Sequence, residues 1–350
     1  MNKLSFFFFL LLSVQLLHGQ QVKMVNLDAK NAQEFSLKLS EIAESVKPIA
    51  LETKNEIVGD VLLTSEYVFI KSFKTISQYD LSGKFIREID CGNFITLNLA
   101  ADTIKKELYV PMGKTLRCYD FSGKLKKTYN LENETISCYY HKGNLWIQSN
   151  SVSADYKLAD YKISHLNLLT GKETFIPSEI QEKSYSENGG ILFGKGNFST
   201  YNNTLVTSFF NEDNTIYQIR EQKVSPIIKG VITPPDKTPS TEIYPGSKGI
   251  VGKYLFFNYR FRETIGINYF YLEDMKSGKT YNLEVNSNSG FLTSGIIDDI
   301  FHTGYFTIED KLNKEGYFYF RKFRNEFKDQ SIGNIPLQEG DVLFIVKTKQ

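Results

Sequence analysis

Short stretches in which apolar and polar residues alternate run through most of the chain, separated by residues typical of turns. In TISQYDLSGKFIREI (75–89), alternate residues are apolar or aromatic on both sides of Ser-Gly-Lys. A period of two is the pattern of a β-strand, and glycine suits a tight turn because it tolerates positive φ. The stretch therefore predicts a β-hairpin.

This hairpin recurs along the chain. YDLSGKFIREID occupies 79–90, and YDFSGKLKKTYN occupies 119–130. Two further short strands precede each hairpin, so the repeating unit has four strands. Four-stranded units at this spacing are the signature of a β-propeller, whose blades bury their faces by packing radially against one another. Three looser copies follow, and the five turns carry Lys84, Lys124, Lys172, Lys223 and Lys279.

We predict one all-β domain, a six-bladed β-propeller of four-stranded antiparallel blades, over residues 46–350. The final blade has three strands of its own, which we assign to GIIDDIF (295–301), GYFYFRKF (316–323) and DVLFIVKTK (341–349). SVKPIALET (45–53) supplies the fourth strand, so the ring closes by pairing an N-terminal strand with the C-terminal blade. Such closure leaves no open strand edge. A pair of open β-sandwich sheets is the alternative architecture.

The first twenty residues, MNKLSFFFFLLLSVQLLHGQ, have a different character. A basic start at Lys3, an apolar core too short to span a bilayer and the small residue Gly19 predict a secretory signal peptide over 1–20. A buried N-terminal strand or helix is the alternative. No lipobox cysteine follows, so we expect a protein exported to the periplasm or the extracellular space, with no transmembrane segment after cleavage. Residues 21–45 predict a linker with a short helix or an edge strand.

Composition narrows the classes of partner. Lys+Arg number 41 and Asp+Glu 40, whereas a nucleic-acid-binding surface needs a clustered basic excess, so we expect no nucleic-acid partner. The aromatic fraction of 14% favours β structure. Cys91, Cys118 and Cys138 match no metal-site spacing and lie among strand-like residues, so they predict buried free thiols. One disulfide with one remaining thiol is the alternative that an odd count allows in an exported chain.

Several of these stretches together resemble a known family. LSEIAESVKPIALET (39–53), the two SGK hairpins, IIDDIF (296–301) and VLFIVKTK (342–349) are similar to secreted six-bladed β-propeller proteins of Bacteroidetes, distant relatives of NHL-repeat and TolB-like propellers. The resemblance covers nearly all of the chain after the signal. It implies the fold and no defined activity, because its motifs are turns and strands. Many members carry a lipoprotein cysteine after the signal, which this chain lacks.

Residues suited to catalysis or metal binding are sparse. His141, His165 and His302 lie in different contexts without an HxH or HExxH pair, so no zinc site is predicted. Calcium requires several converging oxygen ligands, for which Asp298 and Asp299 are the best candidates. Adjacent residues of a strand point to opposite faces, and a hydrogen bond to loop backbone is the alternative role for either carboxylate.

A second candidate ligand site lies in NYRFRE (258–263). Arg260 and Arg262 share one face of a strand beside Tyr259, and guanidinium groups bind carboxylates or sulfated sugars. A solvated outer strand is the alternative. The sequence contains no nucleophile elbow, P-loop or dinucleotide fingerprint.

We therefore expect a binding or protein-interaction module whose ligand is an unknown protein or a glycan, and we lean against an enzyme. A hydrolase or lactonase-like propeller enzyme acting on a small sugar-derived substrate is one alternative, and an accessory protein of a glycan-uptake system is another. The enzyme would need carboxylates from several blades at one end of the ring. A binding module would instead present an apolar or aromatic patch.

Overall fold

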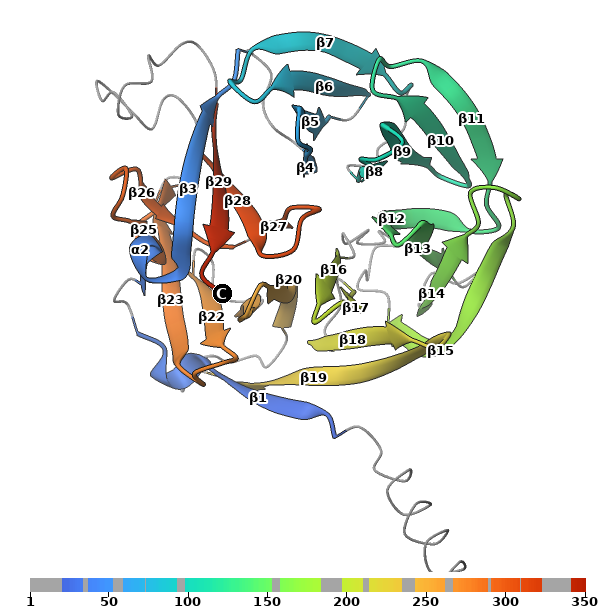
Figure 1. Ribbon diagram of the computed structural model, residues 1–350. Coiled ribbons are helices and arrows are strands. Elements are labelled where there is room, and N and C mark those ends of the chain that lie inside the picture. The colour runs from blue at the N-terminus through green and yellow to red at the C-terminus, as the bar shows by residue number, and fades with distance from the viewer. Residues whose placement is uncertain are drawn as a thin grey trace, which may run out of the picture.

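The described residues form seven β-sheets that are arranged around one axis, with the first strand of most sheets innermost (Figure 1). The arrangement is an all-β propeller built mainly of four-stranded antiparallel blades, as the repeated hairpins predicted. This computed structural model describes residues 21–33, 37–52, 59–72, 74–92, 98–152, 158–183, 197–209, 214–234, 243–261, 267–288, 291–308, 310–322 and 341–350.

Blades 1 to 4 follow one another along the chain, and the strands of each pair in sequence order. Blade 1 consists of β4 (Val61–Leu63), β5 (Tyr67–Lys71), β6 (Thr75–Asp80) and β7 (Phe85–Asp90). Blade 2 consists of β8 (Ala100–Asp102), β9 (Glu107–Met112), β10 (Thr115–Asp120) and β11 (Leu125–Asn130). Blade 3 consists of β12 (Glu134–His141), β13 (Asn144–Val152), β14 (Leu158–Leu166) and β15 (Glu173–Lys183). Blade 4 consists of β16 (Asn197–Tyr201), β17 (Thr204–Ser208), β18 (Thr215–Arg220) and β19 (Lys223–Thr233).

Blades 5 to 7 are less regular, and two of them include strands from the N-terminal part of the chain. Blade 5 consists of β20 (Ile243–Val251), β21 (Tyr254–Phe261), β22 (Ile267–Asp274), β23 (Thr280–Asn288) and β24 (Phe291–Leu292). Blade 6 is a small sheet of β25 (Ile296–Asp298), β26 (Gly304–Phe306) and β2 (Leu37–Lys38). Blade 7 consists of β27 (Asp310–Lys311), β28 (Tyr317–Lys322), β29 (Val342–Thr348) and β3 (Ala43–Ala50).

The prediction of six blades is wrong, because three stretches assigned to one final blade belong to two sheets. GIIDDIF contains β25 of blade 6, whereas GYFYFRKF and DVLFIVKTK contain β28 and β29 of blade 7. β25 pairs with β26 and, in parallel, with β2. With this small sheet counted, the ring has seven blades. Strands of two or three residues carry too little alternation to indicate a separate sheet.

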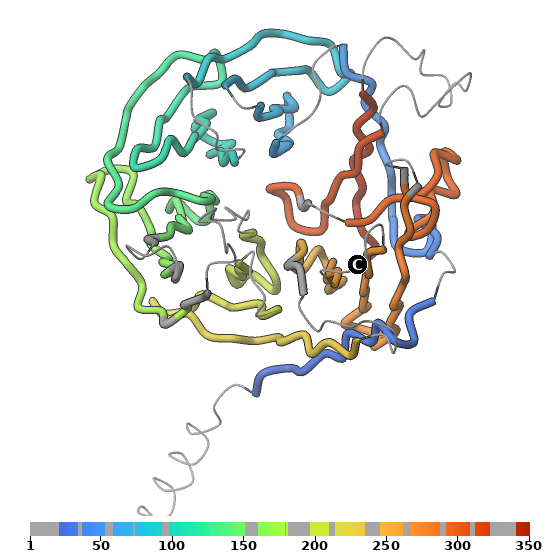
Figure 2. Tube along the Cα trace, turned by 180° about the vertical axis from the view of Figure 1, so that it is seen from behind, coloured from blue at the N-terminus to red at the C-terminus, as the bar shows by residue number. Residues whose placement is uncertain are grey.

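The ring closes by pairing an N-terminal strand with the C-terminal strand, as the sequence predicted. β3 pairs antiparallel with β29, from Ala43 opposite Thr348 to Ala50 opposite Val342. Figure 2 shows the same ring from behind, with the blue N-terminal segment alongside the red C-terminal strand. The pairing supplies the fourth strand of blade 7 and covers an edge of β29 that would otherwise be open.

The repeated hairpin turn packs one blade against the next, which explains its recurrence. The outer strands β3, β7 and β11 run along the perimeter, and each ends near the turn that joins the third and fourth strands of the following blade (Figure 1). A carbonyl of that turn accepts a hydrogen bond from the preceding blade. The bonds are Glu52 N to Gly83 O (3.0 Å), Arg87 Nη1 to Ser122 O (2.8 Å) and the Tyr129 hydroxyl to Leu168 O (3.0 Å).

Glycine is required in the first of these turns. Gly83 has a φ of +94°, and a Cβ atom there would lie 1.9 Å from the carbonyl oxygen of Ala50 in β3. Asp80 fixes the turn, since its Oδ1 accepts hydrogen bonds from two backbone amides of the turn at 2.8 and 3.1 Å. Asp120 repeats this arrangement in blade 2.

The N-terminal segment wraps the perimeter of the later blades. We call residues 23–33 and 37–42 the belt; they lie within the segment expected to be a linker. Its strand β1 (Lys23–Asp28) pairs in parallel with β19, Gln33 forms a parallel bridge with Leu283 of β23, and β2 pairs with β25. Together the belt and β3 follow the outer strands of blades 4 to 7. The belt also contains the short helices η1 (Ala29–Asn31) and α2 (Leu39–Ile42).

The cores lie between facing blades, and the cysteines belong to them. Cys91, Cys118 and Cys138 are buried and free, which confirms the predicted thiols. Burial raises the pKa of Cys91 and of Cys118 to about 11, so both stay protonated at neutral pH. No helix in the described part of the chain is long and apolar enough to cross a membrane.

Candidate functional site

Asp298, one of the two aspartates predicted as calcium ligands, builds a turn of blade 6. It is buried at the end of β25. Its Oδ1 accepts hydrogen bonds from the amides of Ile300 (3.2 Å) and Phe301 (3.0 Å), and its Oδ2 accepts one from the hydroxyl of Thr303 (2.6 Å). The carboxylate therefore has the loop-backbone role that was the alternative to metal binding.

Asp299 points to the belt instead. Its carboxylate accepts hydrogen bonds from the amide (2.9 Å) and the hydroxyl (2.6 Å) of Ser40 in α2. Burial acts to raise the pKa of Asp299, but the hydrogen bonds from Ser40 outweigh it and the pKa is lowered. The two carboxylates thus bind different segments and do not converge on one point.

The two described residues of the second predicted site, Tyr259 and Arg260, are not brought together either. Tyr259 is buried in β21, where its ring stacks on Tyr269 with the centroids 5.4 Å apart and its hydroxyl donates a hydrogen bond to Asn282 Oδ1 (3.4 Å). Arg260 is exposed on the other face of the same strand. Arg262 lies outside the described residues.

The histidines occupy three separate places. His141 ends β12, His165 lies in β14 with its ring 5.5 Å from that of Trp146, and His302 lies in the turn of blade 6 with a φ of +60°. Among the residues that the structure describes, no three or more His, Cys, Asp or Glu side chains are grouped so that they could hold a metal ion.

Hydrogen bonds link neighbouring blades around the axis. They join side chains of inner strands, or residues beside them, to the adjacent blade, and buried polar groups paired in this way hold one relative orientation of the blades. The bonds are Asn98 Nδ2 to Asp60 Oδ2 (2.6 Å), Cys138 N to Asn98 Oδ1 (2.6 Å), Gln148 Nε2 to Ser208 O (3.1 Å), Ser208 Oγ to Lys248 O (3.0 Å), Asn258 Nδ2 to Ile308 O (2.8 Å) and Asn313 Nδ2 to Leu63 O (3.1 Å).

Blades 3, 4 and 7 bring one group of polar side chains together. Thr200 Oγ1 donates a hydrogen bond to Glu315 Oε2 (3.2 Å), and Thr200 also bonds the hydroxyl of Tyr139. Burial raises the pKa of Tyr139 to about 12. The His141 ring stacks on Tyr139 with the centroids 6.4 Å apart, and burial, followed by the charge of Lys142, lowers the pKa of His141. The group offers a neutral imidazole, a neutral phenol and one carboxylate.

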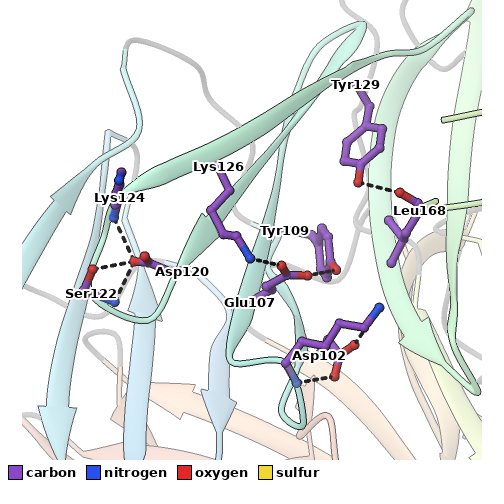
Figure 3. A network of polar contacts seen from close by, with 10 residues as sticks. Asp102, Glu107, Tyr109, Asp120, Ser122, Lys124, Lys126, Tyr129 and Leu168 are labelled. Carbon is purple, nitrogen blue, oxygen red and sulfur yellow. Dashed lines mark hydrogen bonds and ion pairs between the residues drawn. The ribbon is translucent and has the colours of Figure 1, made fainter. Parts of the chain in front are cut away.

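A second polar network joins blades 2 and 3 (Figure 3). Glu107 accepts hydrogen bonds from Lys126 Nζ and from the hydroxyl of Tyr109 (2.8 Å). Burial acts to raise the pKa of Glu107, and these two hydrogen bonds lower it overall. The Tyr109 ring stacks on Tyr140 of blade 3 with the centroids 6.2 Å apart. The network pairs its charges internally and connects the two blades.

The perimeter of blades 1 and 2 is open by comparison. β7 and β11 are their outermost strands, and, as at β15 of blade 3, no described strand pairs with their outer edges. β7 begins with Phe85 and Ile86, which are 39% and 36% exposed. β11 begins with the exposed Leu125 and continues with the exposed Lys126 and Lys127.

Sequence reasoning missed Tyr139, Thr200 and Glu315 because they lie on separate blades and share no motif. The open edge of β7 did have a signal. Phe85 and Ile86 are consecutive apolar residues directly after the Ser-Gly-Lys turn, so one of the two had to face away from the blade core.

The chain is similar to several solved structures, at low identity. No family model and no curated protein matches it. Hydrazine synthase of Kuenenia stuttgartiensis aligns with a TM-score of 0.42 and 13% identity over 69% of this chain and 70% of that one. BamB from Moraxella catarrhalis aligns with a TM-score of 0.42 and 13% identity over 70% of this chain and 68% of that one. The WD40 β-propeller domain of Doa1 aligns with a TM-score of 0.41 and 13% identity over 71% of this chain and 74% of that one.

Proposed function

We propose that the chain is an exported protein-interaction module that binds an extended segment of a partner protein along the outer edge of β7. One observation supports this assignment. The chain adds its own strands β1, β2 and β3 to blades 4, 6 and 7 and an isolated bridge from Gln33 to blade 5, and no described strand is added in this way at β7. Strand addition is a general mode of peptide recognition, in which backbone hydrogen bonds supply affinity.

The composition of β7 favours such a partner. Natural proteins commonly protect exposed edges with charged residues, especially lysine. β11 exposes one apolar residue, Leu125, before Lys126 and Lys127, whereas β7 exposes two, Phe85 and Ile86, before its charged Arg87 and Glu88. The two strands are therefore a matched pair, one receptive and one protected, at equivalent positions in adjacent blades.

Backbone register identifies the amide that tests the proposal. Cys91 N donates to Lys74 O, so the alternation of an antiparallel ladder directs the amide of Glu88 outward, away from β6. Leu131 N donates to Lys114 O in blade 2, which directs the amide of Thr128 outward in the same way. Proline at either position removes an edge donor and leaves the ladder of the blade intact.

The experiment is selection from a library of short linear peptides against residues 21–350. We expect the selected peptides to bind the native chain and the Thr128→Pro variant alike, and to bind Glu88→Pro about tenfold more weakly. Peptides that bind Glu88→Pro as tightly as the native chain, or a selection without enrichment, would contradict the assignment to β7.

The propeller hydrolase or lactonase-like enzyme is the second candidate, and the group around Glu315 is the observation that favours it. That group offers an imidazole and a carboxylate from two blades near one end of the ring. A screen of small sugar-derived lactones with the native chain and the Glu315→Gln variant tests it. Turnover that is present in the native chain and absent in the variant would replace the binding proposal.

A further inference from the structure

Three turns of the ring present an apolar side chain on a rigid support. In each, an aspartate or asparagine accepts hydrogen bonds through Oδ1 from the amides two and three residues further on. Asp102 bonds the amides of Ile104 and Lys105, both at 3.0 Å, and Asn167 bonds those of Leu169 and Thr170, also at 3.0 Å. Asp298 bonds Ile300 and Phe301 in the same pattern. The exposed apolar residue is always the second after the acceptor, at Ile104, Leu169 and Ile300.

These three residues, which we call the tips, are prominent on the surface. Ile104 is 90% exposed and Leu169 is 87% exposed, the two highest values among the large apolar side chains described, and Ile300 is 41% exposed. A single exposed apolar residue needs no explanation. Three that share one backbone device, with their amides bonded to a fixed acceptor, form a pattern.

The tips lie at the same end of the ring. In a four-stranded antiparallel blade, the turn between strands one and two and the turn between strands three and four emerge at one end. Ile104 occupies the first kind of turn in blade 2, and Leu169 occupies the second kind in blade 3.

Backbone contacts bring the blade 6 turn to this end as well. Thr348 N donates to Gly316 O, in the turn between the first two strands of blade 7, and Lys349 N donates to Ile42 O of α2. The same helix holds Asp299, beside Ile300, through Ser40. Blades 2 and 3 are adjacent, and blade 6 lies elsewhere on the ring (Figure 1). Three points spread in this way define a plane.

Cationic side chains accompany two of the tips. Lys105 and Lys106 follow Ile104 and are more than half exposed, although Lys106 pairs with Glu66 (2.7 Å) and Lys105 lies 4.0 Å from Asp102 Oδ2. Lys172 follows Leu169 in its turn and is also exposed. Apolar side chains flanked by lysine are suited to the interface of a bilayer, where the apolar group enters the acyl boundary and the ammonium group meets anionic headgroups.

We infer that this end of the ring docks on the surface of an anionic lipid bilayer through Ile104, Leu169 and Ile300. The contact is peripheral, because the tips are single residues and no segment enters the hydrocarbon core. It is separate from the β7 edge, so the two proposals can fail independently.

Vesicle co-sedimentation tests this inference with residues 21–350. We expect binding to vesicles that contain phosphatidylglycerol, weak binding to vesicles of phosphatidylcholine alone, and weaker binding at high salt because the lysine contribution is screened. Ile104→Asp and Leu169→Asp should each reduce binding to the anionic vesicles about tenfold. Both side chains are almost fully exposed, so these variants should melt at the native temperature.

Met24→Asp is the matched control, because Met24 is 58% exposed on the belt strand β1, away from the tips. It should bind vesicles as the native chain does, and so should Glu88→Pro. Absence of binding to either vesicle, or equal binding by the tip variants, would overturn the inference. A change of oligomeric state that the tip variants abolish, without vesicle binding, would assign the tips to a second copy of the chain and would also overturn it.

Discussion

Blades 1 to 3 and blades 4 to 7 are attached to their neighbours at the perimeter in different ways. At blades 1 to 3, a local turn accepts a hydrogen bond from the outer strand of the preceding blade or from the residues that follow it. Along blades 4 to 7, a remote N-terminal segment follows the outer strands. Blade 4 turns through Glu221 and Gln222 without glycine, and a Cβ atom at Gly278 of blade 5 would meet nothing within 4 Å. The turn between the third and fourth strands is thus constrained where it contacts the preceding blade, and its sequence varies where the belt holds the perimeter instead.

The substitution that we expect to lower the free energy of unfolding most is one that removes packing between the belt and blade 4. Leu27 is fully buried in β1 beside Gly230 of β19. We expect Leu27→Ala to lower the free energy of unfolding by about 3 kcal/mol, through lost transfer energy and a cavity. Met24→Ala on the same strand should change it by less than about 0.5 kcal/mol, because Met24 is exposed. Urea unfolding measures both, and equal values would show that the belt adds no stability.

Gly83 and Gly278 test whether the docking turn is the special one. Both have positive φ, so alanine introduces backbone strain at each. Only at Gly83 would the new Cβ atom also clash with the Ala50 carbonyl. Gly83→Ala should therefore cost about 2 kcal/mol more than Gly278→Ala in urea unfolding. If the two variants lose the same free energy of unfolding, the backbone around Gly83 can move to make room for the new Cβ atom without a loss of stability.

Tyr129→Phe removes one docking hydrogen bond and little else. The Tyr129 hydroxyl donates to Leu168 O at the junction of blades 2 and 3. We expect a loss of about 1 kcal/mol in the free energy of unfolding, the usual net value for such a bond. If the urea unfolding midpoint of this variant equals that of the native chain, the hydrogen bond adds no stability and the packing of the two blades alone holds the junction.

The acid dependence of stability should differ among the docking turns. A side-chain hydrogen bond from Ser82 lowers the pKa of Asp80, and one from Ser122 lowers the pKa of Asp120. A carboxyl group whose pKa is lowered by folding contributes stability above its unfolded pKa, and that contribution is lost as the pH falls through the folded pKa.

Asparagine separates this effect from the turn itself, because blade 3 already uses Asn167 as the acceptor. Asp120→Asn should keep the hydrogen bonds of the turn and reduce the fall in melting temperature between about pH 5 and pH 3. Melting curves over this range give the slope, with the native chain as reference. An unchanged slope would assign the acid sensitivity to other carboxylates.

Local pattern accounts for what could be predicted from the sequence. Alternating residues around Ser-Gly-Lys lie next to one another in the chain, so the hairpins, the four-stranded blades and the buried cysteines could all be inferred. Closure by β3 could be inferred as well, because an unpaired strand at each end leaves one arrangement without an open edge.

Contacts between remote residues account for what could not. β2 has two residues, and its partner β25 lies far along the chain, so nothing near either strand indicates a separate blade. β1 shows alternation only at Val25 and Leu27, which is weak within a polar stretch. Asp298 and Asp299 stand out in the sequence as a pair, yet one caps its own turn and the other binds α2, a division that only the fold determines.

The belt also constrains the order in which the parts of the chain fold. Asn26 and Thr233, which bond across β1 and β19, are 207 residues apart, and Glu44 and Lys347, which pair across the closing blade, are 303 apart. Contacts that bridge such distances form late, because the intervening chain must first be ordered. A nascent chain can complete blades 1 to 3 from neighbouring residues as they emerge, while residues 23–50 wait for strands not yet made. The segment that is synthesised before all the blades is thus the last to pack against them.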